Sequence, residues 1–180
     1  AVNTGRMGLK SSLHIIVDPI PHVAVRVNQR RLVQVLVNLL INSWHAMEHR
    51  GSGTVQISTE VGFGVVKVHV DDDGEGIPPQ RLETVFEPFF TSKPAGKGTG
   101  LGLPISRSYL RAMGGDLTAR LDSQLGGARM TLSLARAAEG EVVSEIDPGR
   151  GRQSAHDSTR ILEAKLAQTT EKPILLVVDD

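Results

Sequence analysis

The sequence predicts an α+β fold in which a long helix lies on a mainly antiparallel sheet. One observation is an amphipathic pattern between residues 28 and 49, where apolar side chains recur every three or four positions. A second is a set of short runs in which apolar and polar residues alternate, as in half-buried strands. Glycine and proline separate these runs, which indicates tight turns between neighbouring strands.

The expected elements follow one another along the first 136 residues. We expect strands at 12–17, 22–27, 54–61, 65–71, 117–121 and 130–134, and helices at 28–49, 78–83 and 101–113. Asn28 is a good N-cap for the first long helix, and Gly51 follows its last turn. Gly62 and Gly64 indicate a hairpin between two of the strands. Residues 91–100 contain almost nothing apolar to bury, so we expect a mobile lid there.

Composition excludes several classes of function. The 180 residues suffice for one domain with a core, plus a remainder. The formal net charge is zero and no basic face dominates, so we expect no nucleic-acid partner. No apolar run reaches the length of about eighteen residues that a membrane span needs, and we expect no signal peptide. The chain has no cysteine, which removes disulfides and thiolate zinc sites and fits a cytoplasmic location.

Composition also divides the chain into segments. Residues 1–11 are polar and are expected to be the end of a preceding element, and residues 12–136 form the main domain. Charged and polar residues dominate 137–172, which predicts a linker with a marginal helix in its second half. Residues 173–180 have the pattern of a buried strand ending in two acids. This segment resembles the start of a response-regulator receiver domain, although any α/β domain could begin in the same way.

The first long helix also carries a polar stripe, which needs partners. Two amides and two imidazoles follow one another at helical spacing: Asn38, Asn42, His45 and His49. Glycine-rich segments that could supply partners lie downstream. One follows a strand that ends in three aspartates, at residues 71–76, and the other opens onto the second long helix, at residues 96–102.

Four motifs in order resemble the N, G1, F and G2 boxes of sensor histidine kinases. They are Asn38-Leu39-Leu40-Ile41-Asn42, Asp72-x-Gly74-x-Gly76-Ile77, Phe86-Glu87-Pro88-Phe89-Phe90 and Gly98-Thr99-Gly100-Leu101-Gly102-Leu103. These boxes mark the catalytic ATP-binding domain of the superfamily of gyrase, heat-shock-90, histidine kinase and MutL. The resemblance covers about residues 12–135. It implies a Bergerat fold, a two-layer sandwich with about three helices on one face of a mixed sheet, and it implies ATP and Mg²⁺ as cofactors.

The resemblance and the residue chemistry together assign candidate roles. Asn42 is the expected Mg²⁺ ligand, because an amide oxygen suits this hard cation. Asp72 is expected to accept a hydrogen bond from the exocyclic amine of adenine, a group that guanine replaces with an oxygen. Asn42, His45 and Lys93 are the expected catalytic residues. The expected nucleotide-binding residues are Asn38, Asn42, His45, Asp72, Gly74, Gly76, Ile77, Phe86, Phe90, Lys93, Lys97, Gly98, Thr99, Gly100, Leu101, Gly102 and Leu103.

Other interpretations of the same residues remain open. Asn42 could be a polar residue satisfied by neighbouring backbone, and the aspartates could form a solvated turn. The aspartates fit no EF-hand, because the later bidentate glutamate is missing. The phenylalanines could be plain core residues instead of the anchor of a lid, and His49 is expected at the surface. The glycines around residue 98 match neither the P-loop nor the Rossmann spacing, and favour phosphate binding by N–H groups at a helix N-terminus.

Position 38 favours a kinase over an ATPase. Relatives that hydrolyse ATP place a glutamate one turn before the metal-binding asparagine, whereas Asn38 has an amide that cannot act as a general base. We therefore expect a protein-histidine kinase that transfers the γ-phosphoryl group of ATP to a protein acceptor. None of the six histidines lies in the setting of the family's phosphoacceptor. The acceptor is thus expected on a separate dimerisation domain, and this chain alone is not expected to phosphorylate itself.

The resemblance also implies partners and leaves two alternative functions. The expected partners are ATP, the histidine-bearing dimerisation domain and a response regulator or receiver domain. The expected parent is a homodimer, membrane-anchored or not, and a monomeric state of this chain stays open. If residues 173–180 begin a receiver, the parent is a hybrid kinase. The alternatives are a serine kinase of the anti-sigma type and a non-catalytic nucleotide-sensing module.

Overall fold

A computed structural model of the chain describes residues 12–93, 98–137 and 176–178. In chain order its elements are β1 (Ser12–Val17), β2 (Ala24–Arg26), α1 (Gln29–Met47), η1 (Glu48–Arg50), β3 (Ser52–Val61), β4 (Val65–Asp72), η2 (Pro79–Arg81), η3 (Thr84–Phe86), α2 (Gly102–Ala112), β5 (Asp116–Arg120), β6 (Arg129–Ala135) and β7 (Leu176–Val178). The three η elements are single turns of 3₁₀ helix. The predicted α+β class is therefore confirmed.

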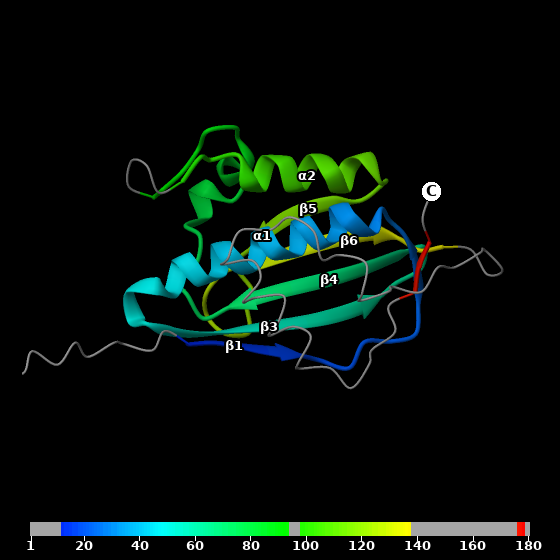
Figure 1. Cartoon of the computed structure of the whole chain (residues 1–180), viewed down its shortest axis with the longest axis horizontal. Coiled ribbons are helices and arrows are strands. Elements are labelled where there is room, and N and C mark those ends of the chain that lie inside the picture. Colours follow the sequence, from blue (N-terminus) through cyan, green and yellow to red (C-terminus); the bar gives the residue numbers. More distant parts are fainter. Residues whose placement is uncertain (1–11, 94–97, 138–175, 179–180) are drawn as a thin grey trace, which may run out of the picture.

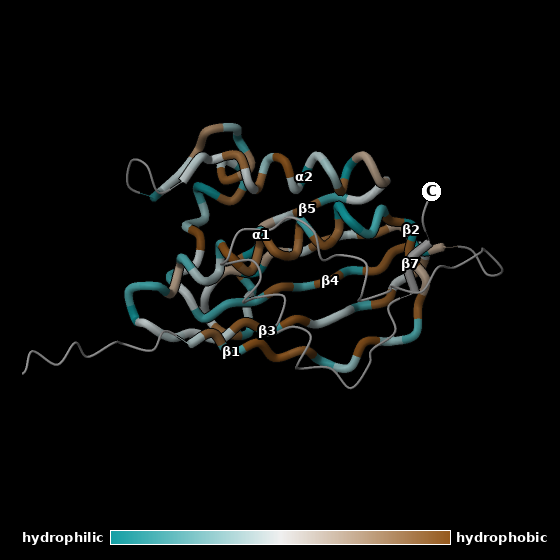
Figure 2. Tube along the Cα trace, viewed as in Figure 1, coloured by the Kyte–Doolittle hydropathy of each residue, from teal (hydrophilic) through white to brown (hydrophobic). Residues whose placement is uncertain are grey.

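Five strands form one mixed sheet in the order β1-β3-β4-β6-β5. Strands β1 and β3 are parallel, and each of the other neighbouring pairs is antiparallel. Helices α1 and α2 lie on the same side of this sheet (Figure 1). Apolar stretches of α1 and of the strands face one another between the two layers (Figure 2). The predicted two-layer arrangement, with helices covering one face of a mainly antiparallel sheet, is confirmed.

Helix α1 forms where the apolar pattern predicts it. Its N-cap is Asn28, whose Oδ1 accepts a hydrogen bond from the backbone N–H of Arg31 at 3.1 Å. The apolar stripe is buried against the sheet, with Leu32, Val35, Leu39, Leu40 and Met47 all at most 4% exposed. The chain then makes one 3₁₀ turn and reverses at Gly51, which has a φ of +69°. The helix thus holds its polar stripe above the ends of the strands.

Some elements differ from the expectation in length. The helix expected at 78–83 is a single 3₁₀ turn, η2, with proline in its first turn, followed by a second turn, η3. The strand expected at 22–27 is shortened to β2. Strand β4 is one residue longer than the expected strand at 65–71, and Asp72 is its last residue.

The expectations for the two ends of the chain fall mostly outside the described residues. These are the N-terminal element at 1–11, almost all of the linker at 137–172 and its marginal helix. Within 173–180, the structure describes β7, which pairs in parallel with β2, Ala24 opposite Leu176. A strand there is confirmed, and its origin in a receiver domain stays a prediction. Among the described residues no helix is long and apolar enough to cross a membrane.

Candidate functional site

The carboxylate of Asp72 is fixed where strand β4 ends. Its Oδ1 accepts hydrogen bonds from the backbone N–H groups of Gly74 and Ala128, both at 3.0 Å. Ser43 of α1 adds a side-chain hydrogen bond, and the residue is only 4% exposed. Burial raises the pKa of the Asp72 carboxyl, although these hydrogen bonds act in the opposite direction. Ser43 bonds to Asp72 and directly follows Asn42 in α1. Asp72, the predicted contact for adenine, and Asn42, the predicted ligand for Mg²⁺, therefore lie on the same side of the sheet.

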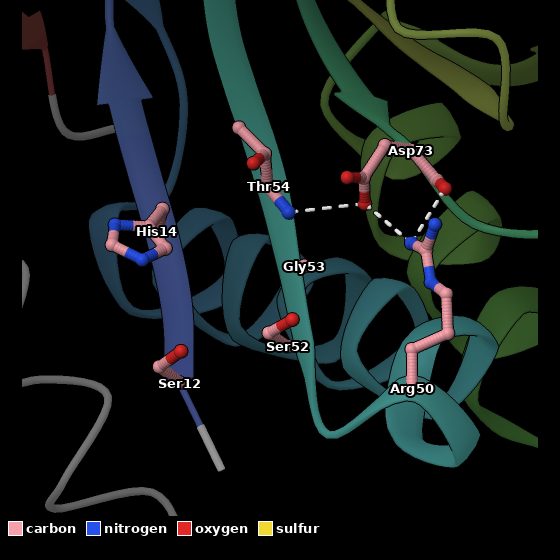
Figure 3. A pocket seen from close by; sticks show the side chains of 7 residues that line it. All are labelled: Ser12, His14, Arg50, Ser52, Gly53, Thr54 and Asp73. Carbon is pink, nitrogen blue, oxygen red and sulfur yellow. Dashed lines mark hydrogen bonds and ion pairs between the residues drawn. The ribbon is translucent and has the colours of Figure 1, made fainter. Parts of the chain in front are cut away.

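The two neighbouring aspartates brace this position from the sheet. Asp71 is 1% exposed and forms a bidentate ion pair with Arg129 of β6, at 2.8 and 3.0 Å. The Oδ1 of Asp73 accepts from the N–H of Thr54 at 3.0 Å and from Arg50 at 2.8 Å, as Figure 3 shows. These contacts tie the end of β4 to β3, β6 and η1. A solvated aspartate turn, the alternative interpretation, is therefore wrong for Asp71 and Asp72.

Sequence reasoning missed the loop that closes over Asp72. Gly127 donates its N–H to the carbonyl oxygen of Asp72 at 3.0 Å, and Ser123 donates its hydroxyl to the same oxygen at 3.3 Å. A Cβ atom on Gly127 would overlap this carbonyl and the carboxylate, and would lie 2.6 Å from the N of Gly74. The sequence shows Gly126-Gly127 only as a turn between two strands. The close approach depends on how β6 is registered against β4, which no local pattern reveals.

The three residues predicted to be catalytic meet at one point. The Nζ of Lys93 lies 3.3 Å from Oδ1 of Asn42 and 2.7 Å from Nδ1 of His45. Burial lowers the pKa of the Lys93 ammonium, while the charge of Glu48 acts in the opposite direction. The Asn42 oxygen thus accepts from a cationic group already, which fits its predicted role as a ligand for Mg²⁺. Among the described residues no group of three His, Cys, Asp or Glu could hold a metal ion by itself.

Asn38 has a different partner from Asn42, the next residue of the polar stripe. Its Nδ2 donates to the Oγ of Ser106 in α2 at 3.0 Å. A Cβ atom on Gly102 would overlap Oδ1 of Asn38 and lie 3.1 Å from Cγ and Nδ2 of the same amide. His49, the last residue of the stripe, is exposed and lies 3.8 Å from Glu75. The predicted stripe therefore divides into a residue facing α2, a pair facing Lys93 and a surface histidine.

The phenylalanine motif is only partly an anchor. Phe86 is buried and lies under the guanidinium of Arg107, whose Cζ is 4.4 Å from the ring centroid. Phe90 is half-buried, with Arg81 5.9 Å from its ring. Phe89 is 75% exposed and has a φ of +66°. It is held by its backbone, because its N–H donates to the carbonyl of Gly100 at 3.0 Å. The expectation of a packed ring is wrong at this position.

The remaining predicted nucleotide-binding residues surround these contacts. Ile77 and Leu103 pack against the core cluster, and Gly76 turns with a φ of +74°. Gly98, Thr99, Gly100 and Leu101 lead into α2, which begins at Gly102. Lys97 lies outside the described residues. The structure thus gathers the four motifs around one end of the α1 and α2 layer.

The two described cavities lie elsewhere. One, of about 350 Å³, is lined by Ser12, His14, Arg50, Ser52, Gly53, Thr54 and Asp73 (Figure 3). The other, also of about 350 Å³, is formed by polar residues of β3, β4, β5 and β6. Neither contains a residue predicted for the site. The roles predicted from the sequence for Asn42 and Asp72 imply one cavity open to both, and this stays a prediction.

Comparison with known proteins identifies similar sequences. A family model described as histidine kinase-, DNA gyrase B-, and HSP90-like ATPase matches residues 27–138. The two-component sensor PprA of Pseudomonas aeruginosa is 42% identical over 128 residues, which are 68% of this chain and 14% of that protein. The sensor histidine kinase ZraS of Escherichia coli K12 is 39% identical over 118 residues, 65% of this chain and 24% of that protein. The chain spans less than a quarter of either relative.

Solved structures show the same arrangement of elements. The catalytic domain of the histidine kinase ThkA has a TM-score of 0.55 and 26% identity, over 70% of this chain and 82% of that one. The ATP-binding domain of PrrB from Mycobacterium tuberculosis has a TM-score of 0.54 and 28% identity, over 70% and 82% of the two chains.

Proposed function

Because the chain belongs to the family of histidine kinase-, DNA gyrase B- and HSP90-like ATPases, we propose that residues 12–136 are the ATP-binding catalytic domain of a sensor histidine kinase. The observation that carries the proposal is the fixed, buried carboxylate of Asp72 beside the polar face of α1. A buried charge is costly, and this one is held by backbone donors instead of a neutralising cation. Such an arrangement suits recognition of a ligand that brings its own hydrogen-bond donor.

Asp72 would select adenine over guanine. Its carboxylate is an acceptor, and the exocyclic amine of adenine is a donor. Guanine presents a carbonyl oxygen at the corresponding position, so a carboxylate would repel it. The backbone around Gly74, Gly127 and Ala128 fixes the carboxylate before the base arrives, which reduces the ordering cost of binding.

The polyphosphate would lie between α1 and the N-terminus of α2. The first N–H groups of α2 have no partner within the helix and favour negative charge. Asn42 would contribute a neutral oxygen to Mg²⁺, which offsets phosphate charge, and Lys93 would move from Asn42 to the terminal phosphate. The Nδ1 of His45 accepts from the ammonium of Lys93 and would guide that movement. The protein would position the γ-phosphoryl group and neutralise its charge, so the transfer would need no general base at position 38.

The acceptor would be a histidine on a separate dimerisation domain of a homodimeric parent. The P–O bond to ADP breaks and a P–N bond to the imidazole forms, with the imidazole proton leaving to solvent. A response regulator would then receive the phosphoryl group. The acidic end of residues 173–180 supports a receiver domain on the same parent, and the need for ATP supports a cytoplasmic location.

Two assays test the proposal. In a titration with Mg²⁺, the chain should bind ATP more tightly than GTP, and equal affinities would contradict the base pocket. With γ-labelled ATP, the chain alone should stay unlabelled, and addition of a histidine-bearing dimerisation fragment should give acid-labile label on histidine. Acid-stable label on serine would instead support a kinase of the anti-sigma type. ATP binding without any label would support a nucleotide-sensing module.

A further inference from the structure

The side chain of Asn38 connects the two long helices. Its Nδ2 donates to Ser106 Oγ at 3.0 Å, and Ser106 is only 3% exposed. Its Oδ1 lies so close to Gly102 that a Cβ atom there would overlap it. Gly102 and Ser106 are four residues apart and share one face of α2. Both ends of the amide are thus engaged by the first turns of α2.

We propose that Asn38 is a positioning residue, which holds the N-terminus of α2 at a fixed place relative to α1 and thereby sets the phosphate-binding geometry. The inference rests on the proposed function, because it assigns a task to α2 within the ATP site. Asn38 acts through Ser106 and Gly102 and does not contact the nucleotide or the metal ion. Asn42, one turn further along α1, keeps the ligand role.

A second anchor at the far end of α2 explains why the first one matters. Asp116 of β5 accepts from Arg107 and from Arg111, each at 3.0 Å, and these hydrogen bonds lower the pKa of Asp116 to about 2 although burial acts in the opposite direction. Those contacts fix the C-terminal half of the helix. The first turn, which carries the unpaired N–H groups, is bonded to α1 through Asn38. This amide therefore acts together with the packing of Leu103 against the core to place the first turn in the site.

An amide at position 38 suits this contact because it can bond to the Ser106 hydroxyl without adding a charge. Asn38 donates to the hydroxyl through Nδ2, and its Oδ1 fits the space that Gly102 leaves open. A carboxylate at position 38 could accept from the Ser106 hydroxyl, but it would place a negative charge beside the phosphates. An alanine on α2 at position 102 would push the amide away from Ser106 without altering either partner of the hydrogen bond.

Nucleotide affinities of the variants Asn38→Ala, Ser106→Ala and the double variant test the proposal. Each single variant should raise the dissociation constant of ATP about fivefold, as expected for loss of one hydrogen bond, and leave that of adenosine unchanged. The double variant should show the effect of one single variant, because both remove the same contact. The loss should persist when EDTA removes Mg²⁺, since Asn38 is not a metal ligand.

Direct contact between Asn38 and the nucleotide would give a different pattern. Ser106→Ala would then leave ATP affinity unchanged, the two effects would add, or the effect of Asn38→Ala would vanish without Mg²⁺. Any of these results overturns the proposal. Gly102→Ala gives an independent check, because it should weaken ATP binding in the wild-type background and add nothing in the Asn38→Ala background. Asp116→Asn is the matched control, which loosens the other end of α2 and should leave the ratio of ATP to adenosine affinity unchanged.

Hydrogen exchange separates this inference from the proposed function. In the nucleotide-free chain, amides of residues 102–106 should exchange faster in Asn38→Ala and Ser106→Ala, with no change in β3 and β4. Unchanged exchange at residues 102–106 overturns the positioning role, whether or not ATP binds. If wild-type protein bound no ATP, the proposed function would fail, and exchange would still decide what Asn38 does to α2.

Discussion

At the base end of the site, Asp72 is held by backbone N–H groups from two loops, whereas at the phosphate end Asn42 is bonded to a side chain, Lys93. The first set of contacts cannot change without moving strands β4 and β6. The second can change by rotation of a single lysine.

This difference indicates that the two ends contribute to binding in different ways. The base end is preorganised, so nearly all of its interaction energy is available for binding. At the phosphate end, Lys93 must first break its hydrogen bonds to Asn42 and His45, so the net contribution of this end to the free energy of binding is smaller. Substitutions at the base end should therefore have larger effects than substitutions at the phosphate end.

Gly127→Ala should have the largest effect, because it disrupts the rigid end directly. The added Cβ would overlap the carbonyl and the carboxylate of Asp72. The carbonyl is part of the backbone, and hydrogen bonds from backbone N–H groups hold the carboxylate, so neither can move away easily. We expect a loss of about 3 kcal/mol in the free energy of unfolding, measured by urea denaturation, together with loss of ATP binding.

The neighbouring residue provides a matched control for Gly127→Ala. Gly126 has a φ of +86° and open space around its Cβ position. Gly126→Ala should therefore cost about 1 kcal/mol in backbone strain and leave ATP affinity unchanged. Equal effects of the two substitutions on ATP binding would show that the close approach to Asp72 is unimportant.

Asp72→Asn should have the next largest effect on ATP binding, and it should not disrupt folding. The new Oδ1 can still accept from Gly74 and Ala128, but the charged acceptor for adenine is lost. We expect ATP binding to weaken by about 2 kcal/mol, roughly 30-fold, and the preference over GTP to disappear. Calorimetric titration of both nucleotides measures this, and an unchanged preference for ATP would contradict the base contact.

The pH dependence of stability in the same variant tests the buried charge. Burial raises the pKa of Asp72 in the folded state above its ordinary value of 3.8, so its contribution favours folding below that pH and is lost as pH rises through the raised pKa. Asp72→Asn should consequently be more stable than wild type at pH 7. Urea denaturation should show that the two proteins converge in stability below pH 3.8.

Lys93→Met should have a smaller effect, because this residue exchanges one set of contacts for another. In the nucleotide-free chain Lys93 already bonds to Asn42 and His45, and burial has lowered its pKa. We expect ATP to bind about fivefold more weakly, about 1 kcal/mol, and ADP to bind unchanged. Lys67→Met, which alters a lysine paired with Glu60, is the control. A hundredfold loss would mean that the phosphate end is as preorganised as the base end.

The sequence predicted the elements and the order of the motifs, because periodicity, caps and glycine turns are local signals. The buried stripe of α1, the N-cap at Asn28 and the strand that begins at Val65 were all found in this way. Recurrence of the stripe also placed Asn42 and His45 together, and the structure brings Lys93 to the same point.

Contacts between distant segments could not be predicted from the sequence. Ser43, Ala128 and Gly127 reach Asp72 only through strand register and helix placement. The partner of Asn38 is 68 residues away, and nothing in the local pattern marks Ser106. The exposed ring of Phe89 was missed for a related reason, since its position follows from the backbone hydrogen bond to Gly100.

Arg50→Gln should have the smallest effect and shows which contacts keep the base end rigid. Arg50 and Asp73 form a partly exposed ion pair at 2.8 Å, with side chains 41% and 31% exposed. Surface pairs contribute little, so we expect a loss of about 0.5 kcal/mol in stability that shrinks further at high salt. The N–H of Thr54 still holds Asp73 at 3.0 Å, so ATP affinity should stay within about twofold. A larger loss of affinity would mean that the ion pair, and not the backbone, fixes the carboxylate beside it.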